Sequence, residues 1–168
     1  MGKNDFWSVV KIYMKPENRV AEINHGEEAY FLKGLSKIVG KEGFVYGIDP
    51  FNPYKKSPKM RSLSKLENVE LIKSKVPNFY KNLKGLDDIL IMDFLFTAYK
   101  IPFDETPNVK VLKYLSKLLK KEGNFILNID RVERGMYKGL YQRTIRENLP
   151  NFKRLFNSED LMVYRKLK

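Results

Sequence analysis

The sequence contains no cysteine and only one histidine, His25, among its 168 residues. The lack of thiols excludes disulfide bonds, zinc sites with thiolate ligands and a cysteine nucleophile. A single histidine argues against a histidine-rich metal site, and we expect no metal. No apolar run approaches the roughly 20 residues that a membrane-spanning helix requires, and residues 1–8 lack the apolar stretch of a secretory signal. The sequence therefore predicts a cytoplasmic protein without a membrane segment.

The length and the apolar content predict one globular domain. A chain of 168 residues has the size of an ordinary domain, and its hydrophobic fraction of 43% is typical of a packed protein. At this size a core forms without disulfides or metal ions. No internal repeat or low-complexity linker divides the sequence. We expect residues 1–168 to form a single domain.

Hydrophobic periodicity predicts an alternation of strands and helices. Five short apolar runs are predicted strands, at residues 19–23, 44–48, 69–72, 88–93 and 124–129. Predicted helices lie before, between and after them, at residues 5–14, 27–39, 59–66, 77–83, 107–121 and 134–148. Alternation of this kind is typical of an α/β fold with a mostly parallel sheet and helices on both faces. We expect the helix within residues 1–18 to pack on this sheet. Two last strands, at residues 152–156 and 161–167, are predicted to form an antiparallel hairpin.

Two loops at the carboxyl ends of predicted strands carry residues suited to a nucleotide-like ligand. In open α/β sheets, ligands bind outside these strand ends. Gly26 lies between the first strand and a helix, where a glycine permits close approach to the backbone and the helix N-terminus favours an anion. Asp49 ends the second strand about 20 residues later, and a carboxylate there suits the two hydroxyls of a ribose. The alternative for Asp49 is a turn-initiating residue before Pro50.

The residues around these loops resemble the class I S-adenosylmethionine-dependent methyltransferases. Glu22, Asn24, Gly26 and Glu28 fall on that family's acidic-x-Gly-x-Gly-x-Gly motif. The final hairpin is similar to the family's reversed hairpin. Residues 38–49 are similar to the end of the family's first helix and its second strand. Residues 118–125 are similar to the helix and turn that lead into its fifth strand. The resemblance covers nearly the whole chain. It implies a three-layer Rossmann-like fold with a mostly parallel seven-stranded sheet and an antiparallel C-terminal hairpin strand.

The resemblance also implies the cofactor, S-adenosylmethionine, and the residues that bind it. Glu22 would hold the methionine amino group, the loop of Asn24 and Gly26 would pass under the cofactor, and Asp49 would bind the ribose. Lys75 follows the third strand, where the family commonly has an acidic residue that binds adenine. We include Lys75 among the expected cofactor contacts.

Asp93, at the end of the fourth strand, is the catalytic residue that the resemblance implies. It would face the methyl group and the substrate and orient the acceptor nucleophile; its alternative role is to close the strand end. Methyl transfer depends mainly on alignment of nucleophile, methyl group and sulfur, so no catalytic triad is required. His25, in the cofactor loop, is either a general base or an ordinary surface residue.

The glycine motif departs from the family pattern, and this keeps a second hypothesis open. Gly26 is the one family glycine present, because Asn24 and Glu28 stand where the other two occur. Asparagine accepts unusual backbone angles, so Asn24 is a tolerable replacement for the first family glycine. The alternative to an enzyme is a catalytically inactive, methyltransferase-like scaffold that binds RNA or a protein partner. A nicotinamide-dependent enzyme ranks last, because the Gly-x-Gly-x-x-Gly fingerprint is absent.

The charge favours RNA as the acceptor or partner. Lys and Arg number 32 against 20 Asp and Glu, a net charge of +12, and such an excess suits an anionic partner. Basic residues are frequent from Lys55 to Lys75 and from Arg131 to Arg154, and tyrosines interleave with them in the second segment. The alternative is a lysine-rich, solvated surface without a partner. Composition alone does not decide between the two.

Overall fold

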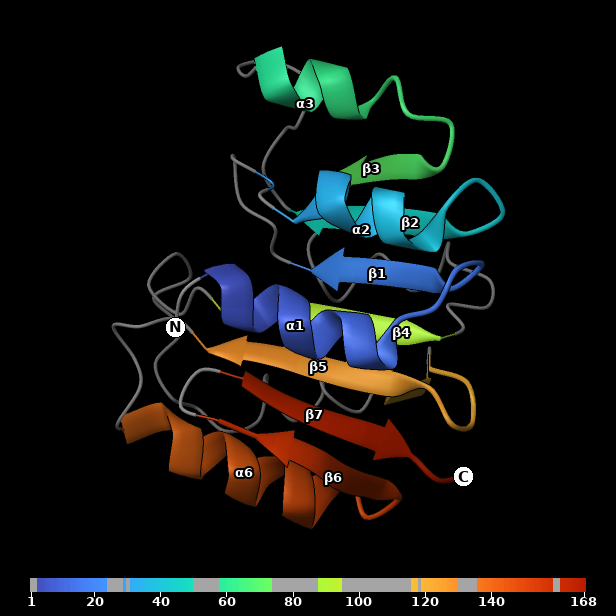
Figure 1. The fold of residues 1–168 in the computed structure, drawn as a ribbon. Helices are drawn as coiled ribbons and strands as arrows, with labels where there is room; N and C mark the ends of the chain where they lie inside the picture. The colour runs from blue at the N-terminus through green and yellow to red at the C-terminus, as the bar shows by residue number, and fades with distance from the viewer. Residues whose placement is uncertain are drawn as a thin grey trace.

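A seven-stranded sheet forms the centre of the protein, in the order β3-β2-β1-β4-β5-β7-β6 (Figure 1). The computed structural model describes residues 3–23, 29, 31–49, 58–73, 88–94, 116–117, 119–129, 136–158 and 161–168. The strands are β1 (Arg19–Ile23), β2 (Phe44–Asp49), β3 (Val69–Lys73), β4 (Ile89–Phe94), β5 (Asn124–Ile129), β6 (Phe152–Asn157) and β7 (Leu161–Lys166).

The first five strands are parallel, and the last two complete the sheet as an antiparallel hairpin. From β1 the chain winds outward through β2 to β3, and then returns to the other side of β1 with β4 and β5. The strand order therefore reverses between β1 and β4. This arrangement confirms the predicted α/β fold.

Both faces of the central strands β1 and β2 are buried, which explains why these strands read as near-continuous apolar runs. In β1, Val20, Ala21 and Ile23 all have an exposed fraction of 0%, although successive side chains point to opposite faces. The described helices are α1 (Lys3–Tyr13), α2 (Leu32–Val39), α3 (Pro58–Leu63) and α6 (Met136–Asn148). Side chains of α1, α2 and α3 share one hydrophobic core with the strands. Figure 1 shows α1 and α2 side by side over the same face.

Helix α1 belongs to this core. Phe6, Val9 and Val10 are buried in it, and the ring of Phe6 lies 4.1 Å, centroid to centroid, from that of Phe31 at the start of α2. Trp7 contacts the same Phe31 ring edge-on at 5.7 Å. The chain before β1 is therefore part of the packed sheet face. No helix in the described ranges is long and apolar enough to cross a bilayer.

Predicted and observed elements agree closely for the strands, and one helix boundary is wrong. Residues 27–39 were expected to be one helix, but Ala29 has a φ of 43° and α2 begins only at Leu32. Ala29 is fully buried in the core. Its left-handed backbone conformation breaks the helix, because α-helical residues need a negative φ. The predicted helices at residues 77–83 and, for most of its length, 107–121 lie outside the described residues.

Candidate functional site

The carboxyl ends of β1, β2 and β4 meet at one edge of the sheet, where the strand order reverses. Parallel pairing joins Glu22 of β1 to Gly47 of β2 on one side and to Ile91 of β4 on the other. In open α/β sheets, ligands bind beyond the carboxyl ends of the strands at such a reversal. The region beyond the end of β1 is therefore the position at which a ligand is expected.

Glu22 is completely buried, with an exposed fraction of 0%. It alternates along β1 with Ala21 and Ile23, so its side chain lies on the same face as Val20, which packs in the core with α1 and α2. Burying a carboxylate costs free energy compared with burying an apolar side chain of similar size. A carboxylate kept at this position suits a specific electrostatic task at the strand end.

Asp49 is the last residue of β2 and is 3% exposed. It lies two residues beyond Gly47, the partner of Glu22, so the two carboxylates are on the same face of the sheet. A strand spacing of about 4.8 Å and a rise of about 3.3 Å per residue put their Cα atoms roughly 8 Å apart. On its other side Asp49 pairs in register with the exposed Lys73 of β3.

The backbone of Asp93 lies in the matching position on β4. Asp93 is two residues beyond Ile91, the other partner of Glu22, and it pairs in register with Asn128 of β5. By the same spacing its Cα is also roughly 8 Å from that of Glu22, and about 10 Å from that of Asp49. The backbones of three predicted site residues thus meet at one end of the sheet. Asn24, His25, Gly26 and Lys75 lie outside the described residues.

Gly47 is a feature of this site that the sequence reasoning missed. A Cβ atom on Gly47 would lie 2.6 Å from Cδ1 of Leu32 and 3.0 Å from Cδ2 of Leu71. The missing side chain lets the first residue of α2 pack directly on β2, beside Glu22. A glycine within an apolar strand often marks such a close approach, and this signal was present in the sequence. In the described ranges, no three His, Asp or Glu side chains gather as a metal site.

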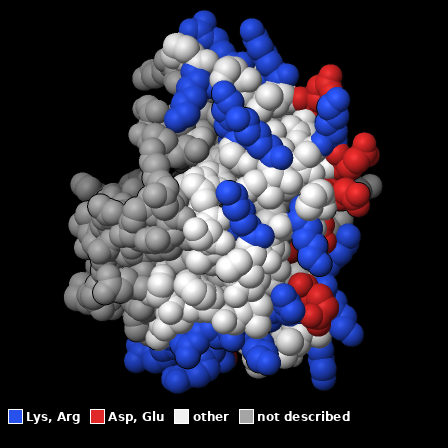
Figure 2. All heavy atoms as spheres, viewed as in Figure 1, with Lys and Arg blue, Asp and Glu red and all other residues white. Residues whose placement is uncertain are grey.

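Exposed acidic residues mark the opposite end of the sheet. Four of them each stand two residues before a parallel strand, at Glu17, Glu42, Glu67 and Glu122. Figure 2 shows Asp and Glu along one side of the molecule, where they are interspersed with Lys and Arg that also occur elsewhere on the visible face. Because these glutamates precede the strands, they lie at the amino ends. Exposed lysines stand at the same end, at Lys15, Lys41, Lys65 and Lys121, and they balance the four glutamates in number.

The two basic segments lie at opposite edges of the sheet. Helix α3 and β3 belong to the first segment, and α6 and β6 to the second, while β3 and β6 are the two outer strands. Six strand spacings of about 4.8 Å separate these strands by roughly 29 Å. The described parts of the two segments therefore form two separate surfaces.

The chain is similar to known proteins in its three-dimensional structure. No protein-family model matches the chain, and no curated protein matches it by sequence. A SAM-dependent methyltransferase from Aquifex aeolicus is 20% identical, with a TM-score of 0.65, 98% of this chain and 90% of that chain covered. An rRNA methylase from Streptococcus thermophilus is 15% identical, with a TM-score of 0.67 and coverages of 96% and 94%.

A third similar structure is fibrillarin from Aeropyrum pernix, in complex with S-adenosyl-L-methionine. It is 13% identical, with a TM-score of 0.62, and the likeness covers 90% of this chain and 67% of that chain. All three likenesses extend over nearly the whole chain at low sequence identity. They show that the protein has the Rossmann-like fold of S-adenosylmethionine-dependent methyltransferases.

Proposed function

We propose that this protein is an S-adenosylmethionine-dependent methyltransferase that binds its cofactor at the carboxyl ends of β1, β2 and β4. The observation that carries the proposal is the pair of buried carboxylates, Glu22 and Asp49, on one face of two adjacent strands. They stand at the reversal of strand order in a methyltransferase fold. Nothing else in the described sheet buries two acidic groups so close together.

The chemistry of these side chains fits the groups that the cofactor would present. Asp49 accepts hydrogen bonds from the two ribose hydroxyls, for which a carboxylate is suited. Glu22 offers a negative charge to the methionine ammonium group, and low polarity around it strengthens that attraction. We assign the loop of Asn24 and Gly26 to the space beneath the cofactor, and Lys75 to the surroundings of the adenine.

The proposed mechanism is a displacement in which the chain mainly aligns the reactants. The bound cofactor supplies a methyl group on a positively charged sulfur. Asp93, on the strand next to Glu22, would orient the acceptor nucleophile. The sulfur of the cofactor would serve as the leaving group. The proton of the nucleophile passes to Asp93 or to water, and positioning accounts for most of the rate gain.

RNA is the acceptor class that we propose, and the cytoplasm is the proposed compartment. The net charge of +12 supports a polyanionic substrate.

Calorimetry with adenosylmethionine and adenosylhomocysteine tests the cofactor assignment. We expect micromolar binding by the natural sequence. Asp49→Asn keeps one acceptor oxygen but loses the charge, and a hydrogen bond to a charged group contributes about 1.5–3 kcal/mol. The dissociation constant should therefore rise about 10- to 150-fold.

Asp88→Asn is the matched control for that experiment. Asp88 is a half-buried aspartate at the amino end of β4, where its Oδ2 accepts a hydrogen bond from the backbone N–H of Arg19 at 3.0 Å. An asparagine oxygen accepts the same bond, so cofactor binding should be unchanged. No binding by the natural sequence up to millimolar cofactor would contradict the proposed activity. Unchanged affinity in Asp49→Asn would contradict the role of that residue alone.

A further inference from the structure

We propose that the surface of α6 and β6 is the docking site for the RNA backbone. This α6–β6 surface consists of Arg143, Arg146 and Arg154, all exposed. The inference rests on the proposed function in one respect, namely that the docked RNA is the substrate of the methyl transfer. Docking itself requires no cofactor, so the two proposals can be tested separately.

The α6–β6 surface differs from the other basic surface in the type of its cations. Its three cations share residues 143–154 with one carboxylate, Glu147. From residue 58 to 73, across α3 and β3, there are four cations against two exposed carboxylates. All three cations of the α6–β6 surface are arginines, whereas α3 and β3 carry one arginine, Arg61. Arginine contacts phosphate with two parallel hydrogen bonds, which lysine does not match.

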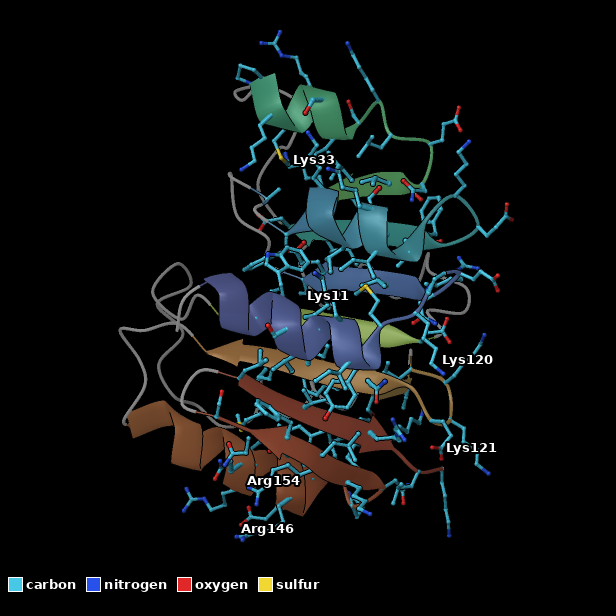
Figure 3. The ribbon with its side chains drawn as sticks, in the orientation of Figure 1. Lys11, Lys33, Lys120, Lys121, Arg146 and Arg154 are labelled. Carbon is cyan, nitrogen blue, oxygen red and sulfur yellow. The ribbon has the colours of Figure 1, made fainter. Side chains whose placement is uncertain are left out.

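Helix α6 presents its arginines away from the core. Ile145 and Leu149 are buried, whereas Arg143 and Arg146 are exposed and lie one helical turn apart. Gln142 Nε2 donates a hydrogen bond of 3.2 Å to Asn157 Oδ1 of β6, which ties the helix to the outer strand. Arg146 and Arg154 come from these two elements at the same end of the molecule, as Figure 3 shows.

The outer strand adds one cation to this surface. Arg154 pairs in register with Tyr164, and its positive charge counteracts the burial that raises the pKa of that phenol. Lys153, the preceding residue, points to the opposite face of the sheet and pairs there with Arg165. Arg165 Nη1 lies 4.0 Å from Glu122 Oε2, so the like charges of this pair are offset within the chain.

Protection of an outer strand from aggregation is the competing explanation. Lysine on an edge strand discourages pairing with another chain, and this accounts for Lys153 without any ligand. It does not account for Arg143 and Arg146, which lie on a helix. The continuation of charge from strand to helix favours RNA.

Salt-dependent RNA binding provides the test. Binding of a fluorescently labelled single-stranded RNA of mixed sequence is followed by anisotropy over a series of KCl concentrations. The variant Arg146→Gln/Arg154→Gln removes two charges from the α6–β6 surface. Arg61→Gln/Lys65→Gln removes two exposed charges from α3 and the turn that follows it, at the opposite sheet edge. Both variants change the net charge equally, so they separate local contacts from the general field.

The first variant should reduce the salt slope by about 1.4, because each phosphate contact to a single strand contributes about 0.7. Its affinity at low salt should fall about tenfold or more, while Arg61→Gln/Lys65→Gln changes the slope by less than half as much. Equal losses in both variants would overturn the proposal, as would a larger loss at α3 or no RNA binding by the natural sequence. Melting temperatures check that both variants are folded.

Cofactor calorimetry on the same proteins keeps this proposal apart from the proposed function. Adenosylmethionine binding by both variants together with selective RNA loss supports docking and the enzyme. RNA binding that depends on the α6–β6 surface, without any cofactor binding, supports docking and overturns the enzyme. Cofactor binding with equal RNA losses in the two variants overturns docking and leaves the enzyme in place.

Discussion

Gly47 links the packing of α2 to the proposed cofactor site, and its replacement by alanine is the sharpest test of this part of the structure. The new Cβ would lie 2.6 Å from Cδ1 and 3.1 Å from Cδ2 of Leu32. Leu32 is fully buried and Leu71, the other neighbour, is 6% exposed. Neither side chain has free space beside it, so α2 or β2 must shift by up to about 1 Å to reach normal contact distance.

The expected cost follows from overpacking. Inserting a methyl group into a well-packed core costs about 1–3 kcal/mol. Replacing glycine by alanine also restricts the unfolded chain, and this effect stabilises the folded state by about 0.4–1 kcal/mol. We therefore expect Gly47→Ala to lower the free energy of unfolding by about 1–2 kcal/mol. Leu32 begins α2, so the shift should also weaken adenosylmethionine binding, although no group assigned to the cofactor is removed.

A double-mutant cycle with Leu32→Val isolates this contact. Valine lacks the Cδ atoms that meet the new methyl group, and alone it should cost about 1 kcal/mol. In Gly47→Ala/Leu32→Val the cost should be smaller than the sum of the single costs by about 1 kcal/mol. Urea unfolding followed by circular dichroism measures all four proteins. Additivity within about 0.5 kcal/mol would refute the reasoning.

Gly40→Ala is the control for the same chemical change. Gly40 has a φ of 71° with no atom within 4 Å of a built Cβ, so its replacement creates backbone strain without a clash. A strained position of this kind costs about 1–3 kcal/mol. This loss should not be relieved by Leu32→Val, because the two side chains do not meet.

Two further predictions concern stability. Asn68 Nδ2 donates hydrogen bonds to the carbonyl oxygens of Ser36 at 3.1 Å and Gly40 at 2.7 Å, at the end of α2. An aspartate at position 68 cannot donate these bonds, so Asn68→Asp should lower the free energy of unfolding in urea by about 2–4 kcal/mol. A loss under about 0.5 kcal/mol would contradict the capping role. Burial raises the pKa of Tyr164 above its ordinary value of 10.0, with Arg154 opposing. The folded state therefore holds this proton more tightly than the unfolded state, and stability falls as pH rises above about 10. Tyr164→Phe should lose less stability between about pH 9 and pH 11, and parallel pH profiles of the two proteins would contradict this.

The strands could be predicted almost residue by residue. Parallel strands covered on both faces are apolar throughout, and turn residues mark both their ends. β1 (Arg19–Ile23) and β5 (Asn124–Ile129) agree with the expected bounds. The early start predicted for α2 was wrong, because the φ of Ala29 depends on how that residue is buried in the core and not on helical periodicity.

The candidate site was predictable in its position and only partly in its composition. Glu22 and Asp49 were expected at strand ends, and their backbones lie there with both side chains buried. The roles of these residues, and of Asp93, stay predictions. Gly47 was missed because its importance lies in contact with Leu32 and Leu71, which are distant in sequence.

The sequence by itself determined the order and nature of the elements, because hydrophobic periodicity and turn residues act locally along the chain. It also determined that acidic residues end β1, β2 and β4 or lie next to their ends. Only the tertiary structure decided which strands are neighbours. That choice depends on how helices pack across the sheet, through contacts between residues far apart in the chain. It brought Glu22, Asp49 and the backbone of Asp93 to one place, and it sent the two basic segments to opposite edges.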